Sequence, residues 1–306
     1  METTTRSGFA RTAWAVLGLN VAVILGGSVV RATDSGAGCG ETWPGCSGEG
    51  TAMVIELTHR LTSALALAGV VLLFFWARRL FVARRPVRLA ARAALFFIIV
   101  EALIGAALVV FGWVEDDESV GRAIAVSVHL TNTFLLLGTL TLTAWWGSGR
   151  PEPTAEAVHR ERWFFGTGAV ALLAIGMTGA LNALGDTLFP AASLSEGFEA
   201  DFAEGAHFLV RLRILHPLVA VAAGILVLVL AARMSEGATG IVRRAGVAVM
   251  VLVGVQVFAG MANLLLLTPL ASQLVHLFLA DVLWIAFVVL GAAVAGARPP
   301  APAPVP

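Results

Sequence analysis

The sequence predicts an all-α integral membrane protein in which eight transmembrane helices form two tandem four-helix bundles related by a parallel pseudo-two-fold repeat. Three observations lead to this prediction. The chain of 306 residues is 58% apolar and only 13% charged, with a mean hydropathy of +0.88, which excludes a water-soluble domain. Eight stretches are long and apolar enough to cross a bilayer. Finally, the two halves of the chain resemble each other.

Each predicted span is an apolar stretch of roughly 20 residues, the length that a helix needs to cross the hydrocarbon of a membrane. Lipid offers no hydrogen-bond partners to the backbone, so the stretches are predicted to be helices. They cover residues 13–31, 52–76, 90–113, 122–146, 163–184, 208–233, 244–267 and 272–296. The chain then divides into an N-terminal segment 1–12, a first unit 13–146, a connection 147–162, a second unit 163–296 and a tail 297–306 that is predicted to be disordered.

The arginines predict the orientation of the spans. Most of them lie near the N-terminus or in the connections that follow the even-numbered spans, such as Arg84, Arg85 and Arg150. The opposite connections are acidic, as in residues 115–118 and 196–204. By the positive-inside rule, both termini and the connection 147–162 are predicted to be cytoplasmic. The chain is therefore predicted to be a multi-pass protein of a bacterial plasma membrane, with its first connection on the outer face.

The internal repeat brings the same residue types to matching places in the two halves. The matching pairs are His59 and His216, Gly105 and Gly260, and His129 and His276, within the segments 56–61 and 213–218, 101–105 and 256–260, and 127–130 and 274–277. Because each unit has an even number of helices, both units enter the membrane from the same side. This predicts a repeat axis along the membrane normal.

Four histidines occupy matching depths near the outer ends of the even-numbered spans. They are His59, His129, His216 and His276. Polar side chains within a membrane are costly and often mark function. Two histidines that face each other across a bundle can bind a haem iron from both sides; copper or zinc is the alternative, but zinc sites use more protein ligands. The pattern favours non-covalent haem b, whereas His159 and His207 are predicted to be surface or structural residues.

Charged residues near the histidines differ between the two halves. Glu56 lies three residues before His59 and shares its helix face, whereas Arg213 holds the matching position in the second half. Arg213 and Arg60, with Arg211, are predicted to bind haem propionates, although Arg211 could instead snorkel to the interface. A carboxylate in a poorly solvated pocket can move protons, so the first half is predicted to be the reactive one.

The first outer connection holds both cysteines of the chain. It reads Arg31-x-Thr-x-Ser-Gly-x-Gly-Cys39, followed by Trp43-Pro44-x-Cys46. On the outer side of the membrane the compartment is oxidising, so Cys39 and Cys46 are predicted to form a disulfide. This disulfide would pin the loop as a lid over the first site or serve only as a stabilising clip.

These motifs together resemble the heme A synthase family over residues 14–296. The motifs are the cysteine loop, Glu56-x-x-His59-Arg60, Leu215-His216-Pro217, and Gly260-x-x-Asn263 with Pro269, His276-Leu277, Asp281 and Trp284. The resemblance implies an enzyme that oxidises the C8 methyl group of haem O to a formyl group, giving the haem A of terminal oxidases. It also implies haem b between His216 and His276, substrate haem between His59 and His129, and a role for Glu56 in the reaction.

Two other functions fit part of the pattern. A di-haem electron carrier linked to quinol explains the four histidines but neither Glu56 nor the cysteine loop. A transporter with parallel repeats explains the duplication, but the broken helices typical of transporters are indicated only weakly, at Pro217 and Pro269. For the enzyme, the predicted partners are haem O, the synthase that supplies it and membrane lipid, without nucleic acid. The electron donor and homo-oligomerisation stay open.

Overall fold

The computed structural model describes residues 2–40 and 43–297. In these residues the chain forms ten helices and no strand: α1 (Glu2–Ala32), α2 (Gly50–Leu80), α3 (Arg85–Val110), α4 (Val120–Gly147), α5 (Ala155–Leu188), α6 (Leu194–Phe202), α7 (Phe208–Leu212), α8 (Leu215–Ser235), α9 (Gly240–Leu265) and α10 (Leu270–Ala295). Eight helical segments are long and apolar enough to cross a membrane, so the predicted fold class is confirmed. The predicted disordered tail falls, from residue 298 onward, outside the described residues.

Several helices extend beyond the predicted spans, because local capping residues rather than hydropathy set their ends. Pro86 lies in the first turn of α3, where a missing N–H costs nothing. The Ser119 hydroxyl caps α4 by accepting a hydrogen bond from the N–H of Arg122, and Thr154 caps α5 by accepting one from Ala157. As a result α5 begins inside the segment expected to be a connection, and α1 begins inside the segment expected to precede the first span.

The outer connection after α5 contains two features that hydropathy does not predict. The short helix α6 begins after Ser193, whose hydroxyl accepts a hydrogen bond from the N–H of Glu196. The sixth span is divided into α7 and α8 around Arg213, four residues before Pro217. Proline lacks an N–H and clashes with the carbonyl four residues earlier, so Pro217 explains where the helix breaks.

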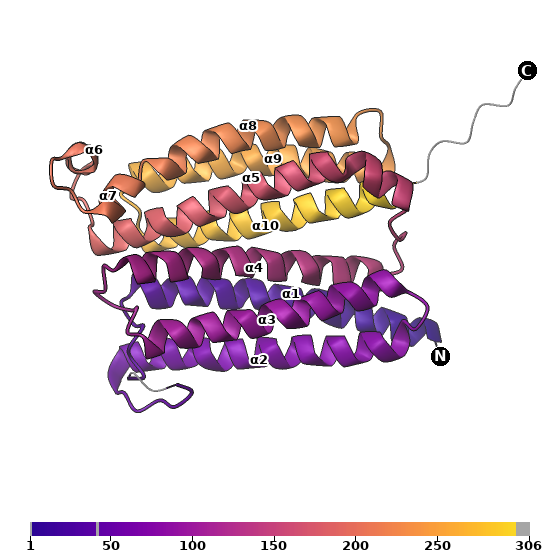
Figure 1. The fold of residues 1–306 in the computed structure, drawn as a ribbon, viewed down its shortest axis with the longest axis horizontal. Coiled ribbons are helices and arrows are strands. Elements are labelled where there is room, and N and C mark those ends of the chain that lie inside the picture. Colours follow the sequence, from indigo (N-terminus) through magenta and orange to yellow (C-terminus); the bar gives the residue numbers. More distant parts are fainter. Residues whose placement is uncertain (1, 41–42, 298–306) are drawn as a thin grey trace, which may run out of the picture.

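The helices form two groups of four that lie one above the other in Figure 1. In the first group, α1 and α3 each contact α2 and α4; in the second, α5 and α9 each contact α8 and α10. The spans α4 and α10 lie at the boundary between the groups. Their most apolar windows are 50% buried, against 17–28% for the other six. A pseudo-two-fold relation between the groups stays a prediction.

An aromatic contact holds the boundary between the groups. The indole N–H of Trp284 in α10 donates to the carbonyl oxygen of Phe134 in α4 over 2.5 Å, and the two rings stack with centroids 5.9 Å apart. A Cβ at Gly138 would lie 3.3 Å from Nε1 of Trp284. Membrane helices associate through such close packing because lipid supplies no hydrophobic driving force between them.

The packing of α5 against α10 gives a direct test of the fold. A Cβ at Gly168 would lie 2.4 Å from Cζ of the buried Phe287, so we expect Gly168→Ala to destabilise the protein by about 1–3 kcal/mol through overpacking. Gly166→Ala is the matched control, since no atom lies within 4 Å of a Cβ there, and alanine favours the helix. Thermal unfolding in detergent measures both; equal melting temperatures would contradict this packing.

Candidate functional site

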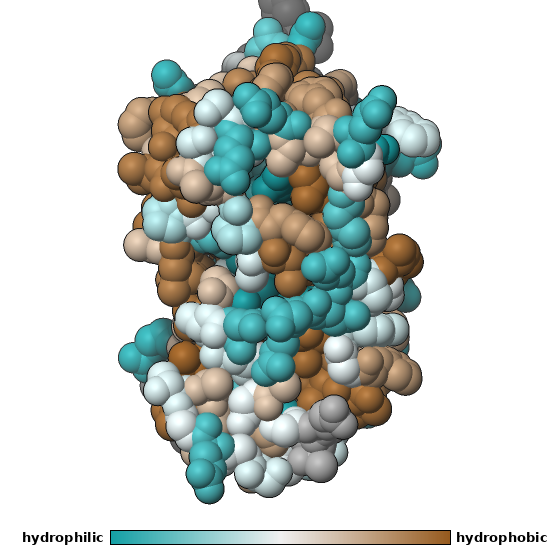
Figure 2. All heavy atoms as spheres, turned by 90° about the vertical axis from the view of Figure 1, so that its left-hand side faces the viewer, coloured by the Kyte–Doolittle hydropathy of each residue, from teal (hydrophilic) through white to brown (hydrophobic). Residues whose placement is uncertain are grey.

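The four histidines lie near the starts of α2, α4, α8 and α10, which are all at the left-hand end in Figure 1. Figure 2 looks onto this end and shows hydrophilic side chains in a band across its middle. The imidazole rings of His216 and His276 face each other with centroids 6.3 Å apart and planes at 81°. His59 and His129 lie close enough to interact electrostatically. The structure thus brings the histidines together in the two pairs that the repeat predicts.

Each of these imidazole rings lies against a glycine of a neighbouring helix. A Cβ built on the glycine would lie 3.1 Å from ring Cε1 for Gly27 and His59, 3.9 Å for Gly105 and His129, 3.1 Å for Gly179 and His216, and 2.9 Å for Gly260 and His276. In three of the four pairs, any side chain on the glycine would press on the ring. The repeat pointed to Gly105 and Gly260. It missed Gly27 and Gly179, although each is a glycine in the first span of its unit.

His129 has an acidic neighbour on α3. Its Nδ1 lies 3.3 Å from Oε1 of Glu101, although the geometry is not that of a hydrogen bond. Glu101 is held in turn by the Asn132 amide, which donates to Oε2 over 2.5 Å, and by the Thr133 hydroxyl. Glu101 therefore lies beside the first histidine pair. The sequence alone showed a polar residue within the membrane at this position and assigned no chemistry to it.

The second pair has a neutral residue, Gln256, where the first pair has Glu101, and it has Arg213 where the first pair has Glu56. Nδ1 of His216 lies 3.3 Å from the Thr178 hydroxyl. Gln256, which matches Glu101 in the repeat, donates from Nε2 to the backbone oxygen of His276 over 3.1 Å. Nδ1 of His276 is buried without a hydrogen-bond partner among the described residues, and so is Nδ1 of His59. The two pairs therefore differ in the charge of the side chains around them.

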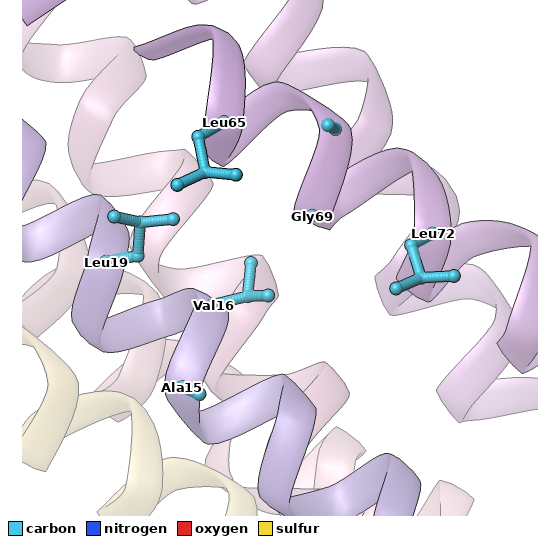
Figure 3. Close-up of a pocket in the computed structure, with 7 residues that line it drawn as sticks. Ala15, Val16, Leu19, Leu65, Gly69 and Leu72 are labelled. Atoms are coloured by element: carbon cyan, nitrogen blue, oxygen red, sulfur yellow. The ribbon is translucent and has the colours of Figure 1, made fainter. Parts of the chain in front are cut away.

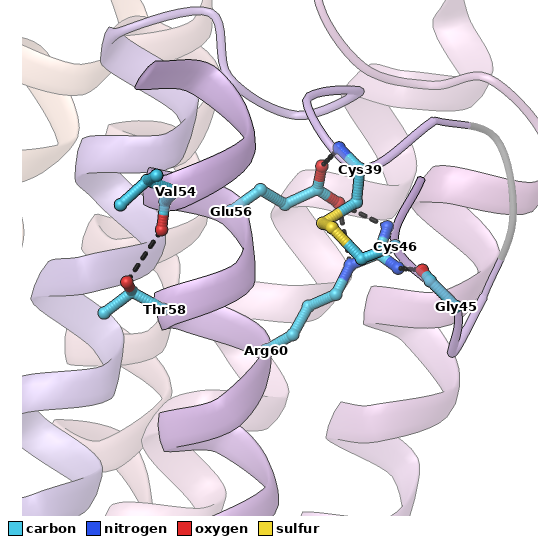
Figure 4. Close-up of a disulfide and its surroundings, with 7 residues drawn as sticks. All are labelled: Cys39, Gly45, Cys46, Val54, Glu56, Thr58 and Arg60. Carbon is cyan, nitrogen blue, oxygen red and sulfur yellow. Dashed lines mark hydrogen bonds and ion pairs between the residues drawn. A yellow bond between two sulfur atoms is a disulfide. The ribbon is translucent and has the colours of Figure 1, made fainter. Parts of the chain in front are cut away.

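Glu56 links the cysteine loop to α2 (Figure 4). Its buried carboxylate accepts a hydrogen bond from the backbone N–H of Cys39 over 2.6 Å and one from Nε of Arg60 over 2.9 Å. Arg60 also donates to the carbonyl oxygen of Gly45 over 2.6 Å. The predicted disulfide between Cys39 and Cys46 is confirmed. The loop is thus fastened to α2 one helical turn from the first histidine pair, and the ion pair at i and i+4 was readable from the sequence.

Arg213 pairs with carboxylates of the protein itself. Its guanidinium donates to Asp201 over 2.8 and 3.0 Å, lies 3.5 Å from Asp186, and donates to the carbonyl oxygen of Phe189 over 3.0 Å. Arg211 is exposed. Arg60 and Arg213, both predicted to bind propionates, therefore each hold a carboxylate of this chain already, and that role stays a prediction.

The two remaining histidines lie away from both pairs. His159 is exposed. The ring of His207 caps α7 by accepting a hydrogen bond from the N–H of Leu209 over 3.4 Å, and it packs against Phe189 and Phe208. These placements agree with the surface and structural roles that the sequence predicts.

Asp281 is a buried carboxyl group in the middle of α10. It has no exposed surface, and neither of its oxygens has a hydrogen-bond partner in the described part of the chain. It lies on α10 one turn before Trp284, the residue that contacts α4. We assign no chemistry to it.

A groove of about 350 Å³ runs between α1 and α2 on the outer surface of the bundle (Figure 3). Its walls are apolar and include Val16 and Leu19 of α1 and Leu65 and Leu72 of α2, and Gly69 leaves space in it. A groove with this lining suits a hydrocarbon chain of the surrounding lipid. It carries no group that could take part in a reaction.

The fold and the paired histidines define a multi-pass membrane protein with two histidine pairs near one end of the bundle. In residues 2–40 and 43–297, no group of three or more His, Cys, Asp or Glu side chains could hold a metal ion. The chain matches the model of the COX15-CtaA family, described as cytochrome oxidase assembly protein, over residues 10–54 and 49–288. It belongs to this family.

Relatives carry two different names. The chain is 45% identical over 299 residues to a protoheme IX farnesyltransferase of Thermus thermophilus, in a match that covers 95% of this chain and 49% of the relative. It is 36% identical over 146 residues to the heme A synthase of Halalkalibacterium halodurans, covering 46% and 47% of the two chains. With the heme A synthase of Geobacillus kaustophilus it shares 40% identity over 121 residues, 38% of each chain. The chain spans about half the length or less of these relatives.

Proposed function

We propose that this protein is a heme A synthase, which oxidises the C8 methyl group of haem O to a formyl group and so provides the haem A of terminal oxidases. The observation that carries the proposal is the two histidine pairs at one end of a membrane-spanning bundle, with each ring seated against a glycine. Family membership and the relatives named heme A synthase support the same function.

The second pair fits a haem iron between its rings. His216 and His276 would hold the iron, since imidazole nitrogens are usual ligands of a haem iron. The ring centroids of His216 and His276 are 6.3 Å apart. The Thr178 hydroxyl faces Nδ1 of His216, which leaves Nε2 for the iron. We therefore assign haem b to this pair and the substrate haem O to His59 and His129.

Acidic residues favour the first pair as the place of reaction. Glu101 lies beside His129, and Glu56 lies one turn from His59. At the matching places the second pair has Gln256 and Arg213, and the charge of Arg213 is paired with Asp186 and Asp201. Conversion of the methyl group to a formyl group with water as the source of the oxygen atom releases electrons and protons. The bound haem, together with an electron acceptor, would supply the oxidising power because no side chain can. Glu56 would accept a proton or stabilise positive charge, while the cysteine loop limits access of water.

The arginines support a cytoplasmic location for both ends of the described chain. The start of α1 and the end of α10 lie at the same end of the bundle in Figure 1. At that end Arg84 donates to Glu152 over 2.5 Å and to the carbonyl oxygen of Arg150 over 2.9 Å. The cysteine loop and the histidine pairs would then lie toward the outer face of a bacterial plasma membrane.

A second candidate function is suggested by the Thermus thermophilus relative, which is named a farnesyltransferase. That relative is about twice as long as the part that this chain matches. Transfer of a farnesyl group needs no axial ligands on the iron, so the two histidine pairs would have no evident purpose in that reaction. We therefore prefer the oxidation of haem O, in which the pairs have a defined role.

Expression in a bacterium that makes haem O but no haem A tests the two functions together. Chromatography of the extracted haems should show haem A or its hydroxylated precursor. Haem O formed in a host that otherwise makes only haem B would instead support the farnesyltransferase. A folded, red protein that yields neither product would leave the di-haem electron carrier as the better explanation.

Glu56→Gln should separate haem binding from the reaction. Glutamine keeps the size of the side chain and can still accept the hydrogen bond from Cys39, but it cannot take up a proton. We expect unchanged haem content and a loss of haem A formation of about 10²-fold or more. Glu49→Gln is the control, because Glu49 is exposed and makes no capping bond at the start of the same helix. Normal haem A yield from Glu56→Gln would remove Glu56 from the reaction.

Gly260→Ala should disturb the second pair without replacing either histidine. The new Cβ would lie 2.9 Å from Cε1 of His276, so the ring must turn or move. We expect haem b affinity to fall by about 10–100-fold, the usual effect of disturbing the support of a ligand. Gly254→Ala in the same helix meets no atom within 4 Å and should retain haem, as read from the absorption spectrum of the purified protein. Equal haem content in both variants would argue against a role of the contact between Gly260 and His276 in haem binding.

A further inference from the structure

Arg31 at the end of α1 reaches across the boundary between the two groups of helices. Its Nη1 donates to the carbonyl oxygen of Ala183 over 2.7 Å and to the hydroxyl of Thr187, both in α5. Its Nη2 donates to Oε1 of Gln273 in α10 over 2.8 Å. One guanidinium therefore contacts three helices, α1, α5 and α10.

The contacts of Arg31 leave its positive charge without a direct counter-ion. All its hydrogen-bond acceptors are neutral, and no carboxylate of the described residues lies within ion-pair distance of it. Asp186 attracts it from farther away, but Asp186 is already engaged by Arg213 and Asn182, and Arg122 repels it. A partly buried cation is costly unless an anion or several hydrogen bonds offset the lost hydration.

The hydrogen bonds of Arg31 also leave one donor available. A guanidinium has five N–H donors, and no described residue accepts a hydrogen bond from Nε of Arg31. The opposite end of the Gln273 amide donates to the carbonyl oxygen of Thr268 over 2.6 Å, which fixes its oxygen toward Arg31. The guanidinium is thus held in one orientation, as a site for a planar anion requires.

Arg31 is linked to both histidine pairs through residues about one helical turn away from them. Gly27, which seats the His59 ring, is four residues before Arg31 on α1. Gln273, which binds the guanidinium, is three residues before His276 on α10. Each separation is about one helical turn, or ~5 Å along the axis. A macrocycle held by either pair would therefore place its edge within reach of this cation.

We propose that Arg31 binds a propionate carboxylate of a haem held by one of the histidine pairs. This inference rests on the proposed function, because it needs haem at those pairs. Arg31 differs from Arg60 and Arg213 in that it has no carboxylate partner among the described residues. Arg31 suits a carboxylate because no described residue accepts a hydrogen bond from its Nε–H and because its positive charge is never lost.

The other role open to Arg31 is that of a strap that only ties α1 to α5 and α10. The two roles make different predictions for the chemistry of the ligand. A strap affects every haem equally through the stability of the protein. A carboxylate site discriminates between haem with free propionates and haem in which both propionates are esterified.

Titration of haem-depleted protein in detergent with iron protoporphyrin IX and with its dimethyl ester separates these roles. We expect Arg31→Gln to raise the dissociation constant of iron protoporphyrin IX by about tenfold or more and to leave that of the dimethyl ester unchanged. Arg31→Lys keeps the positive charge but lacks the planar guanidinium. Its dissociation constant for iron protoporphyrin IX should lie between those of the unmodified protein and Arg31→Gln. Arg233→Gln, which removes an exposed arginine in the last turn of α8, is the control and should bind both haems as the unmodified protein does.

The same titrations in proteins that also carry His59→Ala or His216→Ala show which haem supplies the carboxylate, because each of these substitutions leaves one histidine pair intact. A loss of affinity in either background supports the proposal and identifies the pair whose haem Arg31 holds. Equal losses for the free acid and the ester, or no loss for either, would overturn it in favour of a strap. Unmodified protein that binds no haem would refute the proposed function itself, an outcome distinct from failure of the Arg31 site.

Discussion

An imidazole ring can lie between two closely packed membrane helices only where one helix gives up its side chain. All four rings of the histidine pairs satisfy this condition. In three of the four contacts between a ring and a glycine, even a methyl group on the glycine would press on the ring. The glycines thereby determine both the distance between the helices and the orientation of the rings. Everything that the pairs can bind depends on this spacing, because a rotated ring no longer faces its partner.

The arrangement of the histidine pairs also depends on the boundary between the two groups of helices. Trp284 and Phe134 hold α10 against α4 by a ring stack and a hydrogen bond, and Arg31 joins α1 to α5 and α10 near the histidines. Hydrogen bonds to backbone oxygens fix helices in lipid because water does not compete for the donors. The boundary is therefore a fixed contact that keeps the two pairs at a set distance.

The charges around the histidines distinguish the two pairs. Glu56 and Arg60 fasten the cysteine loop to α2 beside the first pair, while Arg213 is occupied by Asp186 and Asp201 beside the second. Buried charges are stable when they are paired and hydrogen-bonded. The remaining difference is that Glu101 lies beside the first pair, whereas Gln256 holds the matching place beside the second.

The sequence by itself determined the eight spans, the four histidines and the cysteine pair, because hydropathy, repeat spacing and residue type express these directly. It also contained the ion pair of Glu56 with Arg60, since residues four apart on a helix are neighbours. Helix ends, the helix α6 and the break before Pro217 escaped hydropathy because caps and single prolines decide them. Only the tertiary structure could decide that Gly27 and Gly179 seat histidine rings, and that Arg31 meets Thr187 and Gln273, because these contacts join residues from different helices whose rotation and depth are set by packing.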